Sequence, residues 1–365
     1  MTANQAASDA GATPHVAPPR PPSVEDIALG KAVVSGPPAR KVGRAWPGPL
    51  VALAVFAAMI PLAYTLKLGI VTTLTTVLFY MLVAHGWNLL GGYGGYLNFG
   101  IVVFSGTGVY TAALLNTHLG WSMWVTLVPA ALAAALVAVP VGLATLRLRG
   151  HYFAIFTLTL TFLAIVIVLN TPALGGALGV FTTVDTSGGP RALAASFYYA
   201  LLILVVLATV VAWLVEHSNF GYALRAIRED EDAAAVLGVR TFDVKMRALL
   251  LGAAIAGLAG GVYAFQTGYI EPTGAFDLAL SLDIVLVCVI GGLGTWQGPV
   301  IGAAIVVLLE QWLRTTIPTL DPFGMEIPAE ANRLVLGVLL IVFALFARRG
   351  IVGLVRQQRG RQISV

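Results

Sequence analysis

The sequence is poor in charged residues and has almost no cysteine. Lys, Arg, Asp and Glu make up 10% of its 365 residues, against about 25% in soluble domains, and 58% of the residues are hydrophobic. The formal net charge of +4 is too small to argue for nucleic acid as a partner. The single cysteine, Cys288, forms no intramolecular disulfide, so it carries no information about redox compartment. This composition indicates a polytopic membrane protein in a lipid bilayer.

The motifs of soluble enzymes are also missing. The chain has no G-x-x-x-x-G-K-[ST] phosphate loop, no H-E-x-x-H helix, no paired cysteine ligands and no G-x-S-x-G elbow. We therefore predict a protein that is not an enzyme and has no catalytic residue, no metal ligand and no cofactor of its own.

Residues 1–45 are rich in Ala, Pro, Ser and Gly and show no apolar periodicity, which predicts a disordered cytoplasmic tail. The tail lacks the apolar h-region of a signal peptide, so we expect the first span to remain uncleaved. A transmembrane domain is predicted over residues 46–348. A basic cytoplasmic tail is predicted over residues 349–365.

Apolar segments follow the tail, and most are long enough to cross a bilayer. They cover approximately residues 48–67, 69–90, 95–117, 122–146, 152–170, 196–215, 247–268, 278–292, 298–315 and 332–347. The segments 95–117, 278–292 and 298–315 contain or adjoin glycines, so each either spans or re-enters. We predict an all-α polytopic membrane protein with about 10 transmembrane or re-entrant helices and a cytoplasmic coupling helix.

The positions of the basic residues predict the orientation. With ten crossings and the N-terminus inside, most Lys and Arg residues fall on the inner side, as the positive-inside rule requires. The outer side keeps only Lys67, Arg191, Arg314 and Arg333. Both termini are therefore predicted to be cytoplasmic.

The most charged stretch is FGYALRAIREDEDAAAVLGVRTFDVKMRALLL, at residues 220–251. It cannot lie in hydrocarbon, because each central charge costs roughly 2.5–3.5 kcal/mol. We place it in a cytoplasmic loop over residues 216–247. Ile227 to Leu237 is predicted to form one short helix, with acidic residues in its first turn and Gly238 capping its end.

Ala233, Val236 and Leu237 fall on one face of this predicted helix. A small apolar face on a charged surface helix suits docking into a groove of another protein. The alternative is a solvated loop that only connects two spans.

Two glycine-dense stretches occupy residues 91–110 and 291–303. Such stretches permit broken helices or close helix packing, and paired interruptions in transporters mark the substrate pathway. The polar residues that we assign to this pathway are Tyr96, Asn98, Ser105, Thr107, Thr295 and Gln297. Packing between helices remains the alternative for most of the glycines.

Three further polar residues lie within apolar segments. For His85 and Asn88, hydrogen bonds between helices are favoured over a proton relay. Asp283 either has a function or reaches water near the outer boundary.

The spacing from Asp232-Ala233-Ala234 to Gly238 resembles the E-A-A-x-x-x-G coupling motif of bacterial ABC importer permeases. Four features together resemble the LivM-type permeases of branched-chain amino acid importers, from about residue 80 to residue 313. They are GGYGGYLNFG followed by GTGVYTAALL, LRLRGHYFAIFTLTL, RAIREDEDAAAVLGV, and GGLGTWQGPVIGA.

This resemblance implies a multi-pass permease of the bacterial inner membrane that carries branched-chain amino acids or a related small polar solute. It implies as partners a second, LivH-like permease subunit, two cytoplasmic ATPase subunits that use ATP, and an extracytoplasmic substrate-binding protein. The residues that it places against the ATPase are Arg228, Glu229, Asp232, Ala233, Ala234, Leu237 and Gly238.

Two alternatives stay open. Relatives with nearly the same motifs carry urea, short amides or aromatic acids. A stand-alone ion-coupled secondary transporter would instead use Asp283, Glu310 or His85 as its coupling site.

Overall fold

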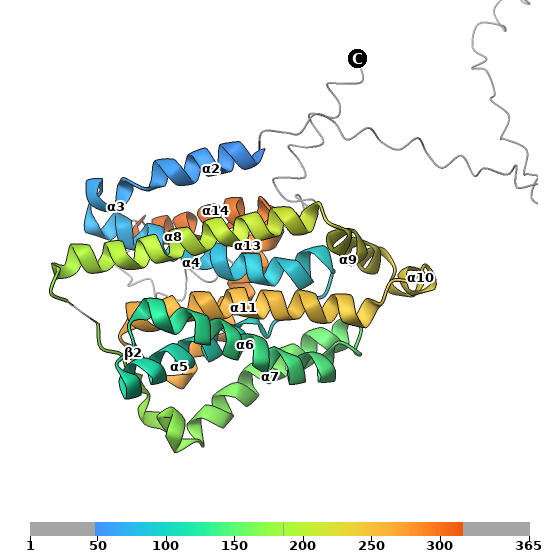
Figure 1. The fold of residues 1–365 in the computed structure, drawn as a ribbon, viewed down its shortest axis with the longest axis horizontal. Coiled ribbons are helices and arrows are strands. Elements are labelled where there is room, and N and C mark those ends of the chain that lie inside the picture. Colours follow the sequence, from blue (N-terminus) through green and yellow to red (C-terminus); the bar gives the residue numbers. More distant parts are fainter. Residues whose placement is uncertain (1–47, 185, 317–365) are drawn as a thin grey trace, which may run out of the picture. The chain divides into compact units, whose positions relative to one another are not determined.

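The computed structural model describes residues 48–184 and 186–316, which are mainly helical (Figure 1). The first helices are α2 (Gly48–Met59), α3 (Leu62–Thr65), α4 (Leu68–Asn88), α5 (Ile101–Leu119), α6 (Met123–Thr145) and α7 (His151–Leu169). The later ones are α8 (Gly189–Glu216), α9 (Asn219–Glu229), α10 (Glu231–Val236), α11 (Thr241–Thr267), α12 (Pro272–Ala275), α13 (Leu278–Gly291) and α14 (Gly298–Thr316).

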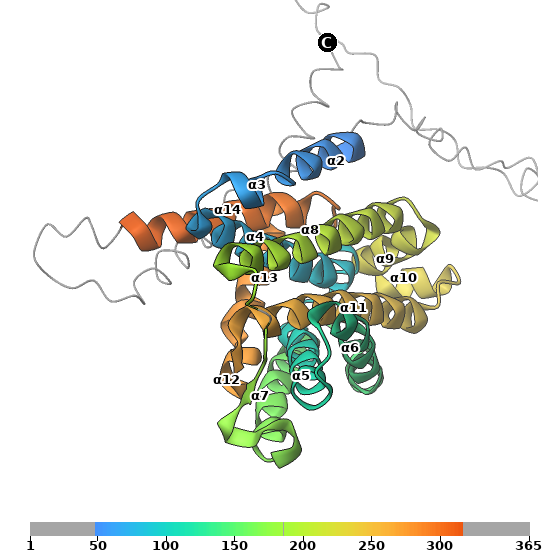
Figure 2. The same ribbon diagram turned by 60° about the vertical axis from the view of Figure 1, so that its left-hand side comes forward.

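Helix α11 lies at the centre of the packing. It packs most extensively against α6 and α5 and also contacts α4, while α4 packs against α8 and α14 (Figures 1 and 2). Small residues make these contacts close. A Cβ on Gly260 would lie 2.0 Å from the carbonyl oxygen of Ser105, and one on Gly252 would lie 2.4 Å from that of Gly86. Such small-residue contacts are typical of helix pairs in membranes.

A short antiparallel pairing joins the connector after α7 to the turn after α11. Strand β1 (Val180–Phe181) pairs with β2 (Tyr269–Ile270), and two 3₁₀ turns, η2 (Pro172–Leu174) and η3 (Gly176–Leu178), precede β1. This pairing and α12 lie at the opposite end of α11 from α10 (Figures 1 and 2).

Two helices break where the sequence is rich in glycine. Helix α4 ends in a π-helical turn, η1 (Leu89–Tyr93), and residues 94–100 are irregular before α5 begins at Ile101. The segment predicted at 95–117 therefore starts its helix six residues later than expected. The second break separates α13 from α14, where Gly292 and Gly294 have φ of 130° and 69°. These left-handed conformations strongly favour glycine.

The helical membrane-protein prediction is confirmed, whereas the count of about ten spans is not. Each predicted apolar segment up to 298–315 overlaps a described helix. Six described helices are long and apolar enough to cross a membrane. The predicted segment 332–347 and the tails at 1–45 and 349–365 lie outside the described residues.

Replacing Gly260 by alanine tests the packing around α11. We expect a lower melting temperature in detergent, because the new methyl group collides with backbone at 2.0 Å and overpacking costs about 1–3 kcal/mol. The matched control is Gly69→Ala in α4, where a Cβ meets nothing within 4 Å. A Gly260→Ala protein that melts at or above the Gly69→Ala protein contradicts the close packing.

Candidate functional site

The charged segment forms two helices, α9 and α10, at the end of the bundle where α8 ends and α11 begins (Figure 1). The prediction of one helix from Ile227 to Leu237 is wrong, because the chain breaks at Asp230. The backbone of Asp230 is extended, and its Oδ1 accepts hydrogen bonds from the backbone N–H groups of Asp232 (2.9 Å) and Ala233 (3.0 Å). A capping carboxylate thus starts a new helix instead of continuing the old one.

The far end of α10 has the predicted glycine cap. Gly238 has a φ of 88°, and its N–H donates to the carbonyl of Ala235 at 3.0 Å. Val236 and Leu237 beside it are 88% and 83% exposed, whereas Ala234 is buried. Two large apolar side chains therefore stand in solvent on an otherwise charged segment.

A buried lysine anchors α10 to the bundle. Lys245 lies near the start of α11 and is buried. Its Nζ donates to Glu231 Oε1 (2.6 Å), the Tyr96 hydroxyl (3.0 Å) and the carbonyl of Leu146 (2.9 Å). These contacts use all three donors of an ammonium group. One cation therefore joins α10, α11, the first glycine-rich stretch and the end of α6.

The carboxylate of Glu231 completes this lysine network. Burial raises the pKa of this carboxyl group. The hydrogen bonds from Lys245 and Tyr96, together with the charges of Lys245 and Arg149, lower the pKa by more than burial raises it, so it lies below the usual range. Burial and the bond to Glu231 raise the pKa of the Tyr96 hydroxyl, which stays a donor. Arg149 lies at the exposed edge of this network, where its Nε is 3.7 Å from Glu231 Oε2 and its two terminal nitrogens each lie 2.9 Å from an oxygen of Asp232.

The two glycine-rich stretches meet beside α9. A Cβ on Gly92 would lie 2.7 Å from the backbone nitrogen of Gly294. Arg228 Nη1 donates to the carbonyl of Gly92 at 2.8 Å, and a Cβ on Gly294 would lie 3.1 Å from that same Nη1. The predicted coupling residue Arg228 therefore touches both stretches.

Side chains satisfy the backbone of the second break. The N–H of Gly294 donates to Asn88 Oδ1 at 3.1 Å, and Asn88 Nδ2 donates to the carbonyl of Thr295 at 3.0 Å. The N–H of Trp296 donates to Glu216 Oε2 at 2.9 Å. Irregular backbone at membrane depth is tolerated where protein groups satisfy it in this way.

The expected hydrogen bonds between helices are confirmed for His85 and Asn88. His85 Nε2 lies 3.1 Å from the hydroxyl of Thr209 on α8. Asn88 joins the end of α4 to the turn between α13 and α14.

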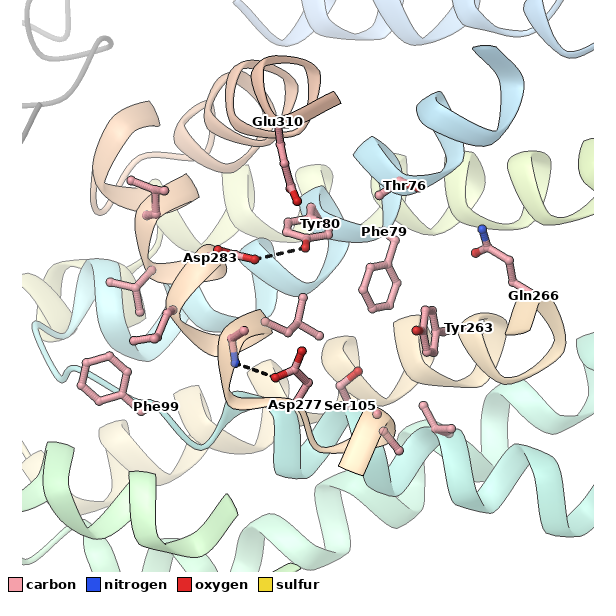
Figure 3. Close-up of a pocket in the computed structure, with 18 residues that line it drawn as sticks. Thr76, Phe79, Tyr80, Phe99, Ser105, Tyr263, Gln266, Asp277, Asp283 and Glu310 are labelled. Carbon is pink, nitrogen blue, oxygen red and sulfur yellow. Dashed lines mark hydrogen bonds between the residues drawn. The ribbon is translucent and has the colours of Figure 1, made fainter. Parts of the chain in front are cut away.

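A cavity of about 670 Å³ lies among α4, α5, α11, α13 and α14 (Figure 3). Its polar and aromatic lining comprises Thr76, Phe79, Tyr80, Phe99, Ser105, Tyr263, Gln266, Asp277, Asp283 and Glu310. The Tyr80 hydroxyl donates to Asp283 Oδ2 at 3.3 Å. Asp277 caps α13 by accepting a hydrogen bond from the N–H of Ala279 at 2.9 Å.

The six predicted pathway residues do not share one cavity. Ser105 lines the cavity just described, whereas Tyr96 belongs to the lysine network. Asn98 accepts from the N–H of Gly100 at 2.9 Å, and Thr107 donates back to Val103 in its own helix. Thr295 and Gln297 lie at the second break. Their role in transport remains a prediction.

The predicted coupling residues all lie in the α9–α10 segment. Arg228 and Glu229 end α9, Asp232, Ala233 and Ala234 lie in α10, and Leu237 and Gly238 follow it. Across the described ranges, no three His, Cys, Asp or Glu residues are grouped to hold a metal ion.

The sequence did not identify the lysine network or most of the cavity lining. Lys245 carried a signal, because a basic residue that opens an apolar run needs a partner. Tyr80 and Gln266 carried none, since isolated polar residues in spans do not reveal which cavity they face.

Comparisons with known proteins agree on one family. A family model described as branched-chain amino acid transport system / permease component matches residues 69–344. The high-affinity branched-chain amino acid transport system permease protein LivM of Escherichia coli is 30% identical, over 85% of this chain and 75% of its own length. The LivM protein of Salmonella typhimurium is 29% identical over the same shares.

Another relative covers less of the chain. The autoinducer 2 import system permease protein LsrC of Escherichia coli is 32% identical over 40% of this chain and 41% of its own length. No solved structure matches the chain.

Replacing Lys245 by methionine tests the lysine network. We expect a loss of about 3 kcal/mol in stability, because removing one partner of a buried ion pair leaves the other uncompensated. The double variant Lys245→Met/Glu231→Gln should recover part of that loss. The control is Arg247→Met, an exposed cation on the same helix. Thermal unfolding in detergent compares the wild type with these three variants. An equal loss of stability in Lys245→Met and in the double variant contradicts the pairing.

The same network predicts acid sensitivity. Because folding lowers the pKa of Glu231, its stabilisation is fully present above the usual value near 4.5 and is lost as the pH falls through the lower folded-state pKa. Melting curves recorded while the pH is lowered from neutral should fall less steeply for Glu231→Gln than for the wild type. Parallel curves would show that Glu231 is not the group responsible.

Proposed function

The chain belongs to the family of branched-chain amino acid transport system permease components, and we propose on that basis that it is a permease subunit of an ABC importer. Its solute is a branched-chain amino acid or a related small molecule. The observation that best supports this proposal is the α9–α10 segment, which carries exposed apolar side chains and is bound to the core through Lys245. The chain itself has no phosphate loop, and the importer proposal therefore assigns ATP use to another subunit.

The proposed assembly contains a second permease subunit, two ATPase subunits and a substrate-binding protein on the other side of the membrane. The ATPase would contact the face that carries Val236 and Leu237, since large exposed apolar side chains are typical of docking surfaces. The positive-inside bias of the sequence supports placing this face, and both termini, in the cytoplasm.

The contacts of α9 and α10 suggest how ATPase movement reaches the membrane domain. Displacement of α10 acts on α11 through the Glu231–Lys245 pair, which is short and shielded from water. Displacement of α9 acts on both helix breaks through Arg228. The segment would act as two linked bodies joined at Asp230, because α9 ends and α10 begins at that residue.

Leu237→Ser tests the docking face. Because burial of a leucine contributes about 1.5–3 kcal/mol, we expect ATPase affinity to fall about tenfold or more in pull-downs from membranes that contain all subunits. The matched control is Leu178→Ser, since Leu178 is 85% exposed, as Leu237 is at 83%, but directly precedes the β1–β2 pairing that follows the far end of α11.

Two outcomes would contradict the proposal. Equal ATPase recovery with both leucine variants would show that Leu237 is not a docking residue. Solute uptake by the purified chain alone, without an ATPase, would instead favour the ion-coupled transporter, for which Asp283 and Glu310 in one cavity are the candidate sites.

A further inference from the structure

Helix α12 forms one wall of the cavity. Gly274 and Ala275 line the cavity from α12, and Ser105 and Val109 line it from α5. Helix α12 is a single turn at the end of α11 that is remote from α10 (Figures 1 and 2). In the orientation that the basic residues predict, this end faces the extracytoplasmic side. The turn therefore lies between the cavity and the solution on that side.

The chain is fixed on both sides of α12, whereas the turn itself is held by packing. Before it, Ile270 of β2 pairs with Val180 of β1. After it, Asp277 caps α13 by accepting a hydrogen bond from the N–H of Ala279 at 2.9 Å. Helix α12 packs against α5 and α7, but no backbone hydrogen bond joins it to either helix within the described residues. The turn can therefore leave these helices without breaking a backbone bond.

Phe276, directly after α12, is the side chain that joins this turn to α5. It is 3% exposed, and its ring stacks on that of Tyr110 with centroids 5.7 Å apart at an angle of 12°. A Cβ on Gly106 would lie 2.3 Å from the Phe276 ring and 2.9 Å from the carbonyl oxygen of Ala275. The absence of a side chain at Gly106 thus allows the ring and the end of α12 to approach α5 closely.

Tyr110 gives an independent sign that this contact is made to open. Its hydroxyl is buried and has no hydrogen-bond partner within the described residues. Buried hydroxyls almost always have a partner, and an unpaired one destabilises the packing that surrounds it. When Phe276 moves away from Tyr110, water can bond this hydroxyl. The packed arrangement therefore carries a penalty that opening removes.

We infer that α12 is a gate between the cavity and the extracytoplasmic solution, and that Phe276 is the positioning residue that holds the gate closed. The described structure is the closed state. In the open state Phe276 leaves Gly106 and Tyr110, and α12 moves between its two fixed ends. The inference rests on the proposed transport function and adds to it the outer gate of the solute pathway.

Labelling of a thiol inside the cavity tests the gate. Ser105→Cys places the thiol in the lining at a residue that is 2% exposed, in a Cys288→Ser background that removes the native cysteine. A positively charged methanethiosulfonate reagent, which does not cross the membrane, is added to spheroplasts that contain the complete transporter. Adding Phe276→Ala should speed labelling about tenfold or more, because the closed state loses a buried ring. The matched control is Phe56→Ala, which removes a similarly buried ring from α2, outside the cavity lining.

Two further variants move the gate in opposite directions. Gly106→Ala should also speed labelling, because the new methyl group displaces the Phe276 ring, whereas Gly69→Ala, with nothing within 4 Å of its Cβ, should not. Tyr110→Phe should slow labelling roughly fivefold or more, because it removes the unpaired hydroxyl and leaves the stacked ring. General damage to the fold would not slow labelling.

The inference is wrong if Phe276→Ala is labelled no faster than Phe56→Ala, if Tyr110→Phe is not labelled more slowly, or if no variant is labelled from outside. Because labelling does not depend on ATP, its result separates the two proposals. Faster labelling of Phe276→Ala without ATP-driven uptake by the wild type counts against the importer function. Uptake by the wild type with unchanged labelling of Phe276→Ala counts against the gate.

Discussion

Two helix breaks inside the bundle impose the constraint that organises the described structure. An unsatisfied backbone group in hydrocarbon costs several kcal/mol, so each break needs partners from the protein itself. Arg228, Asn88 and Glu216 supply these partners, and the two breaks lie in direct backbone contact at Gly92 and Gly294. The first break is bonded by Arg228 of the charged segment, and Asn88, which directly precedes that break, bonds the backbone of the second.

Helix α11 links the two candidate sites. Lys245 near its start holds α10, and Tyr263 near its end lines the cavity. The two residues are 18 positions apart, which is about 27 Å at 1.5 Å per residue. The helix between them is unbroken and packs through small residues against α4, α5 and α6. A movement of α10 therefore acts on one end of a continuous helix, and the other end of that helix borders the cavity.

The sequence predicted features that depend on local chemistry. Charge excluded residues 220–251 from the bilayer, and Gly238 marked the end of a helix. The division at Asp230 was missed because Asp is both an acidic residue for a first helical turn and a strong cap, and the sequence alone did not separate these roles. Gly94 and Gly95 indicated that α5 begins late, but these glycines lie within an apolar stretch that was predicted as one segment.

Contacts between distant segments were beyond sequence reasoning. Tyr80 and Asp283 are separated by 203 positions, and only packing shows that they meet. Likewise, Tyr96 was assigned to the pathway as a polar residue beside glycines, whereas its hydroxyl contacts Glu231 and Lys245. Periodicity identifies the buried face of a helix, but it does not identify the partner opposite that face.

The hydrogen bond between Asn88 and Thr295 also bears on how the protein is made. The two residues are 207 positions apart. At a synthesis rate of 5–20 residues per second, roughly 10–40 s pass between their emergence from the ribosome. Helix α4 therefore has to enter the bilayer with a polar side chain and an open glycine turn whose final partners have not yet been synthesised. During that interval other groups, from lipid, water or the insertion machinery, must satisfy them, and the native contact forms by exchange with those temporary partners.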